Sequence, residues 1–238
     1  MPSDSPLQIS RLLLAGLGTQ LHTYYGDRVP PTGALLVVSN HRSFMDAPLL
    51  MAALNRPIRF ACHHYMSQVP IMREIVTQLG CFPLEASEQR QQSFFRKSIQ
   101  LLQTQQAVGI FPEGAQPMVK YTSPERMGEF QRGFAHLSLR APVPDLAVLP
   151  VAIVATQEAV NSAVPLRLLS LFDPSEPLFT QSGWHPMVVY QRATVVIGRP
   201  YWISADDRER YQGKYARSLV ADLTHKCHSE IETLLHRG

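Results

Sequence analysis

Long apolar runs are missing from this sequence of 238 residues. A helix that crosses a bilayer needs about 20 predominantly apolar residues, and no stretch approaches that length. The most lipophilic segment, residues 12–17 with the sequence Leu-Leu-Leu-Ala-Gly-Leu, is far too short to span. We therefore expect that the protein, if it meets a membrane, lies on its surface.

Cysteine is scarce. Cys62, Cys81 and Cys227 are odd in number, far apart and without CxxC spacing, which predicts neither a disulfide framework nor a four-cysteine zinc site. The pattern favours a reducing compartment. His63 and His64 follow Cys62, but adjacent residues on a strand point to opposite faces, so these three side chains cannot readily hold one ion. We expect no metal.

Charge of one sign is also limited. The charged residues make up 17% of the chain, the formal net charge is +3 and the isoelectric point is near 8.8. No basic run interleaved with aromatic residues is present, so we expect no nucleic-acid partner. The mild positive excess suits an anionic membrane surface or a phosphorylated or CoA-bearing substrate, and it equally suits simple solubility.

The remaining pattern alternates short apolar segments with amphipathic ones. This alternation predicts an α/β fold, with a mixed, largely parallel sheet and helices on both faces. The strands are expected at Ala34–Val38, Ile58–Ala61, Cys81–Leu84, Ala107–Phe111, Leu146–Ala155 and Val188–Ile197, and the helices at Asp46–Leu54, Ile71–Leu79, Glu88–Gln105, Glu129–Arg140 and Ala205–His236.

The first residues carry a separate signal. Ser5-Pro6 is a plausible helix start, and Gly26 a plausible end. Between them apolar residues recur at helical spacing: Ile9, Leu13, Leu17, Leu21 and Tyr24. Such a stripe packs on the protein's own core or dips into a lipid leaflet. We predict a membrane-associating helical segment over residues 1–30 and a single α/β domain over residues 31–238.

A first candidate site lies at "SNHRSFMDAPLL", residues 39–50. His41 falls where a predicted strand ends, and Asp46 falls in the first turn of the next predicted helix. A turn of this length can bring the carboxylate to one imidazole nitrogen and leave the other free, as a general base requires. Asn40 and Ser43 are common turn and capping residues, and Asp46 suits a helix start without any catalytic role.

A second candidate is "GIFPEGAQP", residues 109–117. Proline fixes the exit from a predicted strand, and glycine lets a ligand approach backbone N–H groups that can hold an anion. A Pro-Glu-Gly sequence on its own is more often an ordinary turn. The carboxyl ends of neighbouring parallel strands meet at one edge, so we expect the two loops to converge there.

A nucleophile is not indicated. The sequence holds no GxSxG elbow, and Cys62 and Cys81 fall in apolar strands. The chemistry that the two loops predict is attack on an acyl carbonyl by an acceptor hydroxyl activated by His41, without an acyl-enzyme.

Together these motifs resemble the PlsC-like glycerolipid acyltransferase family in content, order and spacing. The likeness is carried by Asn40-His41-x-Ser43-x-x-Asp46, then Phe111-Pro112-Glu113-Gly114, then Val148-Leu149-Pro150-Val151-Ala152, with weaker echoes in Gly128-x-Phe130-x-x-Gly133 and Ile197-Gly198-x-Pro200. It extends from about residue 34 to residue 153.

The resemblance implies roles for these residues. His41 is expected to be the catalytic base and Asp46 its orienting partner, in transfer of a fatty acyl group from a CoA or acyl-carrier-protein thioester to a lysolipid hydroxyl. Substrate contacts are expected from Asn40, Ser43, Phe111, Pro112, Glu113, Gly114, Arg90 and Pro150, the last belonging to the block associated with the acyl donor. The resemblance further implies no cofactor beyond the thioester co-substrate, and a peripheral position on the cytoplasmic face of a membrane.

One departure from the family pattern bears on the acceptor. Glu85 or Ala86 stands where the family usually has an arginine thought to hold the acceptor phosphate. A carboxylate would repel a phosphate monoester. Arg90 could reach in from the following helix, and Arg42, Lys120 or Arg126 could substitute, so both phosphorylated and neutral or zwitterionic acceptors stay open. Two other functions are also open: a lipid or acyl-CoA binding protein without turnover, and a thioester hydrolase in which His41 activates water.

Overall fold

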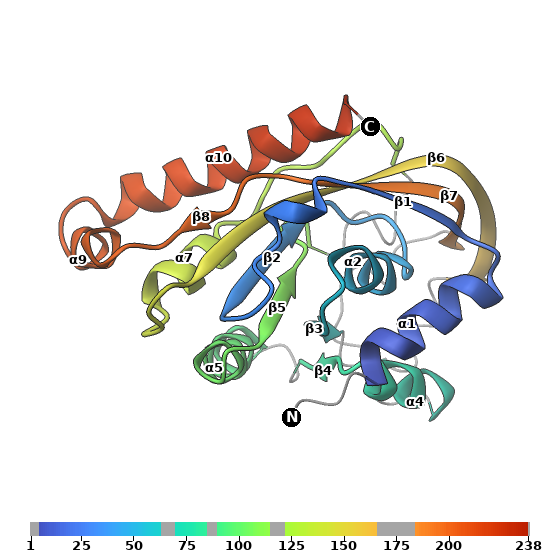
Figure 1. Cartoon of the computed structure of the whole chain (residues 1–238), viewed down its shortest axis with the longest axis horizontal. Coiled ribbons are helices and arrows are strands. Elements are labelled where there is room, and N and C mark those ends of the chain that lie inside the picture. Colours follow the sequence, from blue (N-terminus) through green and yellow to red (C-terminus); the bar gives the residue numbers. More distant parts are fainter. Residues whose placement is uncertain (1–4, 63–69, 85–89, 115–121, 166–183, 238) are drawn as a thin grey trace.

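The structure is a computed structural model, and it describes residues 5–62, 70–84, 90–114, 122–165 and 184–237. Helices and strands alternate along most of the chain (Figure 1). In chain order the elements are α1 (Ser5–Gly16), β1 (Gln20–Tyr24), the 3-10 turn η1 (Gly26–Arg28), β2 (Leu35–Ser39), α2 (Asp46–Leu54), β3 (Ile58–Cys62), α4 (Pro70–Gln78), β4 (Phe82–Pro83), α5 (Arg90–Gln103), β5 (Ala107–Ile110), α7 (Gly133–Arg140), β6 (Ala147–Pro165), β7 (Trp184–Ile197), β8 (Tyr201–Trp202), α9 (Ala205–Gln212) and α10 (Ala216–Leu235).

The strands within the described residues form one mixed sheet in the order β1-β7-β6-β2-β5-β3-β4, with β8 paired to β6. The pairs β6–β2, β2–β5, β5–β3 and β3–β4 are parallel, and β6–β7 is antiparallel. The predicted fold class, a largely parallel mixed sheet, is confirmed.

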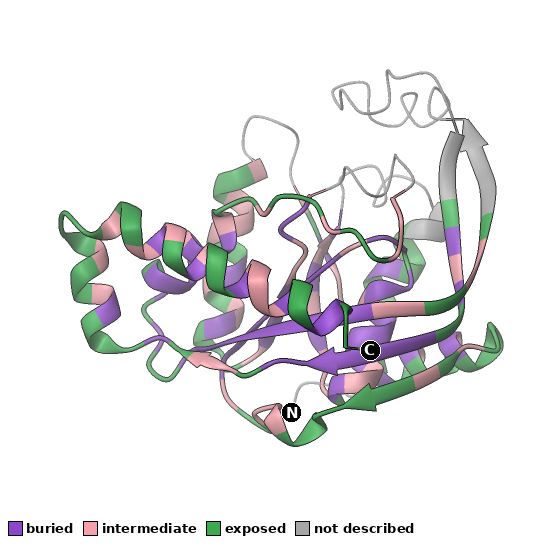
Figure 2. Cartoon of the chain, turned by 90° about the horizontal axis from the view of Figure 1, so that it is seen from above, coloured by how far each residue is buried: buried purple, intermediate pink, exposed green. Residues whose placement is uncertain are grey.

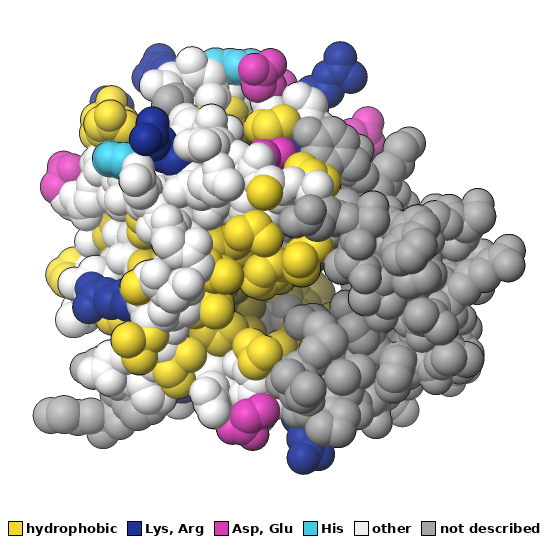
Figure 3. Space-filling view, turned by 90° about the vertical axis from the view of Figure 1, so that its right-hand side faces the viewer, with side chains coloured by type: hydrophobic (Ala, Val, Ile, Leu, Met, Phe, Trp, Pro, Cys, Tyr) yellow, Lys and Arg dark blue, Asp and Glu magenta, His cyan; other side chains and the backbone are white. Residues whose placement is uncertain are grey.

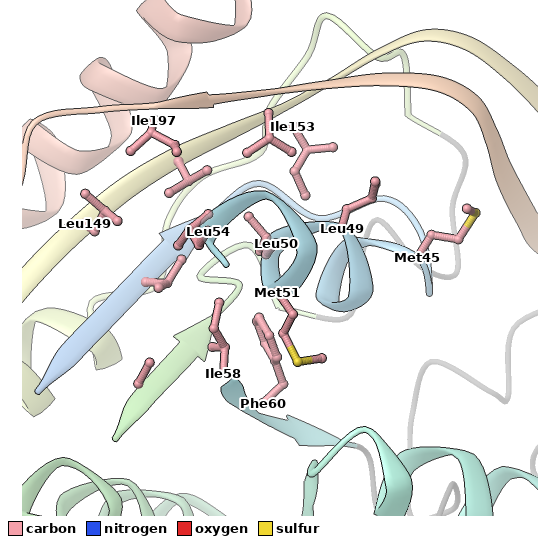
Figure 4. Packing of buried hydrophobic residues seen from close by; sticks show 14 of the residues in the cluster. Met45, Leu49, Leu50, Met51, Leu54, Ile58, Phe60, Leu149, Ile153 and Ile197 are labelled. Atoms are coloured by element: carbon pink, nitrogen blue, oxygen red, sulfur yellow. The ribbon is translucent and has the colours of Figure 1, made fainter. Parts of the chain in front are cut away.

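Helices cover both faces of the sheet. On β2, Leu35 and Val37 pack toward α1 and α2, whereas Leu36 and Val38 pack toward α5, α7 and α10. This period-2 alternation of fully buried side chains places β2 at the centre of the sheet, with a core on either side. Figure 4 shows the first of these cores, where α2 lies between the β6–β7 strands and Phe60 of β3.

The predicted helix over Ser5–Gly26 is too long. The helix ends at Gly16, Gly18 adopts the left-handed backbone (φ +66°) that glycine tolerates, and Gln20–Tyr24 forms β1 instead. Leu21 and Tyr24 keep helical spacing with Leu17, but hydrogen bonding to β7 decides their conformation. β1 is an exposed edge strand, as Figure 2 shows.

The α1 stripe is divided between the core and the surface. Leu7 and Leu14 are buried against the α2 side of the sheet, whereas Leu12 is 72% exposed. Because β1 joins the same sheet as the rest of the chain, residues 20–24 are structurally part of the α/β domain. A membrane role for the first segment stays a prediction.

The predicted C-terminal helix is also wrong as a single element. It is broken into α9 and α10 at Gly213, whose extended backbone (φ −102°, ψ −164°) ends α9. Apart from β6, β7 and α7, which begins at Gly133, four residues after its predicted start, the other predicted elements occur close to their expected bounds, and Asp46–Leu54 is reproduced residue for residue. Strands β6 and β7 extend well beyond their predicted segments as a long antiparallel pair. Among the described residues, no helix combines the length and the hydropathy that a membrane crossing demands.

Candidate active site

The sheet register brings the two sequence motifs to the same edge. Val38 of β2 lies opposite Ile110 of the parallel strand β5. His41 and Glu113 each follow three residues later, so both leave the sheet at its carboxyl edge. The site is therefore positioned by strand pairing at the centre of the molecule.

Asn40 determines where the chain leaves β2. Its side-chain amide donates to the Ile153 carbonyl (2.9 Å), and the Ile153 N–H donates back to Asn40 Oδ1 (2.8 Å). The Asn40 side chain thus bonds the backbone of β6 as a neighbouring strand would, and it is buried. These bonds support the turn-shaping role predicted for Asn40, and a substrate contact stays a prediction.

Ser43 attaches the same turn to β7. Its hydroxyl donates to the Val188 carbonyl (2.6 Å) and accepts from the Met45 N–H (3.0 Å). Ser43 is also buried, so its hydroxyl is used within the protein. Together Asn40 and Ser43 tie residues 40–45 to both long strands, and a substrate contact of Ser43 likewise stays a prediction.

The turn places Asp46 against the imidazole of His41. His41 Nδ1 lies 2.7 Å from Asp46 Oδ2, and that oxygen also accepts the backbone N–H groups of Arg42 (2.7 Å) and Ser43 (2.9 Å). Asp46 is the first residue of α2, where the helix dipole favours a negative charge. The carboxylate is fully buried, whereas the His41 side chain is 17% exposed, so the pair connects the interior to solvent.

The imidazole is also held by its faces. Phe111 stacks on His41 with 4.1 Å between ring centroids and 10° between planes, and Phe60 stacks behind Phe111 at 5.1 Å. No hydrogen bond to His41 Nε2 is found within the described residues. A ring fixed at Nδ1 and by stacking, on a side chain that is partly exposed, suits exchange of a proton at Nε2 with a bound molecule.

The Pro-Glu-Gly bend is a tight, bonded turn. The Gly114 N–H donates to the Phe111 carbonyl (3.1 Å), and the Gln131 N–H donates to the Pro112 carbonyl (2.8 Å). Gly114 has φ +73°, and a Cβ there would stand 2.8 Å from Gln131 Nε2. Glycine is therefore favoured by the backbone conformation, whereas the flexible Gln131 side chain could move away from an added Cβ.

Glu113 links the two motifs directly. Its Oε1 accepts the His41 N–H (3.0 Å), and its Oε2 accepts the Gly128 N–H (2.6 Å). The predicted convergence of the His41 and Glu113 loops is thus confirmed. Glu113 is 8% exposed with both oxygens engaged by backbone, so it braces the site. Its contact with an acceptor stays a prediction.

Arg42 does not face the acceptor side as a free cation. Its guanidinium makes two hydrogen bonds to the Glu158 carboxylate (2.7 and 2.9 Å) and two to the Thr122 carbonyl (3.1 and 2.8 Å), and it is buried. Because this cation is already neutralised by Glu158, the suggestion that Arg42 replaces the missing phosphate ligand is corrected. Of the other candidates, Arg126 is exposed on the surface.

The remaining predicted positions are spread more widely. Arg90 is the half-buried first residue of α5. Pro150 lies inside β6 opposite Val38, and its carbonyl accepts the Gly198 N–H, so it belongs to the sheet. Substrate contacts of both stay predictions. Glu85, Ala86 and Lys120 lie outside the described residues.

Sequence reasoning missed three contributors: Tyr190, which donates to Asp46; Glu158, which pairs with Arg42; and Gly128, which donates to Glu113. Gly128 did carry a signal, the weaker family echo around it. Tyr190 and Glu158 carried none, because their strands lie more than 100 residues from the turn they contact.

The described thiols are unsuited to nucleophilic catalysis. Burial raises the pKa of Cys62 to about 11 and the pKa of Cys81 and Cys227 to about 12, so all three are protonated at neutral pH. No group of three or more metal-ligating side chains is found in the part of the chain that the structure describes. His63 and His64 lie outside it.

Comparisons with known proteins agree with this fold. The solved structure of the 1-acyl-sn-glycerophosphate (LPA) acyltransferase PlsC from Thermotoga maritima is similar in fold, with a TM-score of 0.56 and 18% identity over 93% of this chain and 77% of that one. The acyltransferase family model matches residues 22–154, more than half of the sequence. The chain therefore belongs to the acyltransferase family, as its motifs indicated. A search of curated protein sequences gave no match.

Proposed function

We propose that this protein is an O-acyltransferase that moves a fatty acyl group from a CoA or acyl-carrier-protein thioester to a hydroxyl of a lysophospholipid or related glycerolipid. The single observation that carries the proposal is the His41–Asp46 pair. One imidazole nitrogen lies 2.7 Å from a fully buried carboxylate, and among the described residues the other has no hydrogen-bond partner.

In the proposed reaction His41 Nε2 accepts the proton of the acceptor hydroxyl while its oxygen attacks the thioester carbonyl carbon. Asp46 orients the ring and stabilises the imidazolium that forms. The tetrahedral intermediate then collapses: the carbon–sulfur bond breaks, the new ester remains, and the proton passes from His41 to the leaving thiolate. Proton transfer positioned in this way contributes typically about 10²- to 10⁴-fold to the rate.

Apolar surface beside the turn supports a lipid substrate. Phe44, between Ser43 and Met45, is 41% exposed, and Val160 and Met187 on the neighbouring β6–β7 pair are 44% and 36% exposed. The Ser43 bond to Val188 places these two regions together. Seen from the right-hand side of Figure 1, hydrophobic side chains line a hollow in the surface (Figure 3). Such a surface suits an acyl chain or the boundary of a bilayer.

We propose a peripheral position on a membrane, which we expect to be at its cytoplasmic face; the same apolar surface supports the membrane contact. Leu12 and Leu17 of α1 add exposed apolar area at 72% and 39%. We expect co-sedimentation with vesicles of anionic phospholipid, reduced in Leu12→Ser and unchanged in a surface variant, Thr104→Ser, in the turn that follows α5. Equal recovery of both variants with vesicles would contradict a role for α1.

The choice of acceptor follows from charge. With Arg42 neutralised by Glu158, a phosphate monoester loses one candidate partner near His41. A neutral or zwitterionic headgroup requires no such partner, because it carries no net negative charge that the protein must balance. We therefore expect the rate of acyl transfer to differ among acceptors according to the net charge of their headgroups.

The test is release of free CoA from palmitoyl-CoA, and of carrier thiol from palmitoyl acyl-carrier protein, with and without a panel of lysophosphatidate, lysophosphatidylcholine and monoacylglycerol. Acceptor-dependent release with formation of the acylated lipid supports the proposal. Release that is independent of acceptor would make the protein a hydrolase. Binding of palmitoyl-CoA without release from either donor would make it a binding protein.

A further inference from the structure

Tyr190 contacts the turn that carries His41 from β7, which lies two strands away from β2 in the sheet. It lies on β7, is 1% exposed and is among the largest fully buried side chains. Its hydroxyl donates to Asp46 Oδ1 at 2.9 Å, and its backbone N–H donates to the sulfur of Met45 at 3.2 Å. Both bonds reach the turn that carries His41.

The two oxygens of Asp46 are held in different ways. Oδ2 faces His41 Nδ1 and the backbone N–H groups of Arg42 and Ser43. Oδ1 accepts from Tyr190, and among the described residues no other donor reaches it. Rotation about the terminal torsion of an aspartate is soft, so a carboxylate held at one oxygen alone can turn away from its partner. The Tyr190 bond removes that freedom.

Tyr190 is suited to donate throughout the neutral pH range. Burial, followed by the neighbouring Asp46 carboxylate, raises the pKa of its phenol well above 10, so the group keeps its proton. The other charged groups around it are Arg42 and Glu158, which pair with each other. The neutral O–H of Tyr190 also gives Oδ1 of the fully buried Asp46 carboxylate a hydrogen bond. This bond avoids the free-energy cost of an unsatisfied buried oxygen.

We propose that Tyr190 is a positioning residue for acyl transfer, which acts through Asp46 by fixing the carboxylate plane so that Oδ2 stays aligned with His41 Nδ1. The inference rests on the proposed function of His41 as base. It adds a residue from β7, beyond the span matched by the family model, to the machinery.

The first test is Tyr190→Phe, which keeps the ring and removes the hydroxyl. A hydrogen bond to a charged group contributes roughly 1.5–3 kcal/mol, and we expect a fall in kcat of about 10- to 100-fold with a change in KM below about threefold. The matched control is Tyr201→Phe. Tyr201 donates to Asp207 Oδ1 at 3.1 Å, the same kind of bond in another part of the protein, and its loss is expected to leave kcat unchanged.

A double-mutant cycle identifies the route of the effect. In an Asp46→Ala background, Tyr190→Phe is expected to cause no further loss of kcat, because the carboxylate through which it acts is gone. A further loss equal to that seen in the wild-type background would overturn the proposal. An unchanged kcat in the single variant, when a cooperative thermal unfolding transition confirms that it is folded, would also overturn the proposal.

A readout that needs no activity separates this inference from the proposed function. The proton resonance of the His41 imidazole N–H, assigned by its loss in His41→Ala, reports the bond to Asp46. We expect this resonance to move in Tyr190→Phe and to stay in place in Tyr201→Phe. An unmoved resonance in Tyr190→Phe would overturn the positioning role. Absence of acyl transfer by the wild type would instead count against the proposed function alone.

Discussion

Two buried aspartates of this protein accept a hydrogen bond from a tyrosine, and their surroundings differ in an instructive way. Asp46 accepts from Tyr190 and lies against His41. Asp207 accepts from Tyr201, and its other oxygen accepts the backbone N–H (2.9 Å) and the hydroxyl (2.7 Å) of Ser204. Ser204 in turn accepts the Asp207 N–H at 3.0 Å, which completes a capping box at the start of α9.

A buried Tyr–Asp hydrogen bond is therefore no evidence of catalysis by itself. At Asp207 every donor belongs to the turn that starts a helix or to Tyr201, so the carboxylate stabilises local structure. At Asp46 one partner is the imidazole of His41, whose side chain is partly exposed and whose second nitrogen has no hydrogen-bond partner among the described residues. We therefore propose a catalytic role for Asp46 and a structural role for Asp207.

The largest effect is expected from a matched pair of substitutions, Asp46→Asn and Asp207→Asn. An amide keeps the shape of Asp46 but loses the charge that stabilises the His41 imidazolium, so kcat should fall by about 10²- to 10⁴-fold. Asp207→Asn should leave kcat unchanged. Steady-state transfer assays on both variants provide the check, and equal loss in the two would remove the distinction between the aspartates.

A smaller effect is expected from Phe111→Leu. Aromatic stacking contributes roughly 0.5–1.5 kcal/mol beyond burial, so loss of the His41–Phe111 stack should lower kcat/KM by about two- to tenfold. The control is Phe82→Leu, which removes the Phe82–Phe94 stack, with centroids 6.3 Å apart. A transfer assay on both variants that gives the same kcat/KM would show that stacking on His41 has no catalytic consequence.

Asp207→Ala should affect stability without affecting transfer. Loss of the capping interaction is expected to lower the free energy of unfolding by about 1 kcal/mol at neutral pH. Denaturant unfolding of this variant beside the wild type measures the difference. A change in kcat/KM larger than about twofold would mean that the second aspartate is coupled to the site after all.

The same variant should show a defined pH dependence. Burial alone would raise the pKa of Asp207, but the hydrogen bonds from Ser204 and Tyr201 outweigh it and lower the pKa below the usual value. The stabilisation by Asp207 is therefore complete above the unfolded-state pKa, about 3.9, and is lost as pH falls through the lower folded-state pKa. The difference in free energy of unfolding between wild type and Asp207→Ala should therefore become smaller in that acid range. A difference that grows there would contradict a lowered pKa of Asp207.

Much of the site could be predicted because its signals are local. His41 and Asp46 are five residues apart across one strand–helix turn, and His41 and Glu113 each lie three residues after the paired strand residues Val38 and Ile110. Parallel pairing then brings the loops together by geometry alone. The central strands were similarly evident, since their side chains are apolar toward both faces.

The rest depends on tertiary contacts that leave no local pattern. Tyr190 is 144 residues from Asp46, and an isolated tyrosine in an apolar strand fits core packing equally well. Gln20–Tyr24 kept a helical spacing of apolar residues, yet pairing with β7 made it a strand. Arg42 was a candidate phosphate ligand in the sequence, and only the fold shows that Glu158 of β6 pairs with it. Arg42 can be buried because Glu158, which is distant in the sequence, balances its charge.

The most direct test of the account is the rate of acceptor-dependent acyl transfer by His41→Ala, measured beside His136→Ala. His136 also bonds through Nδ1, to the Tyr211 hydroxyl at 2.9 Å, but it lies on α7 and no carboxylate of the described residues pairs with it. The account predicts a loss of at least about 10²-fold for His41→Ala and wild-type turnover for His136→Ala. Turnover by His41→Ala at the wild-type rate would contradict it.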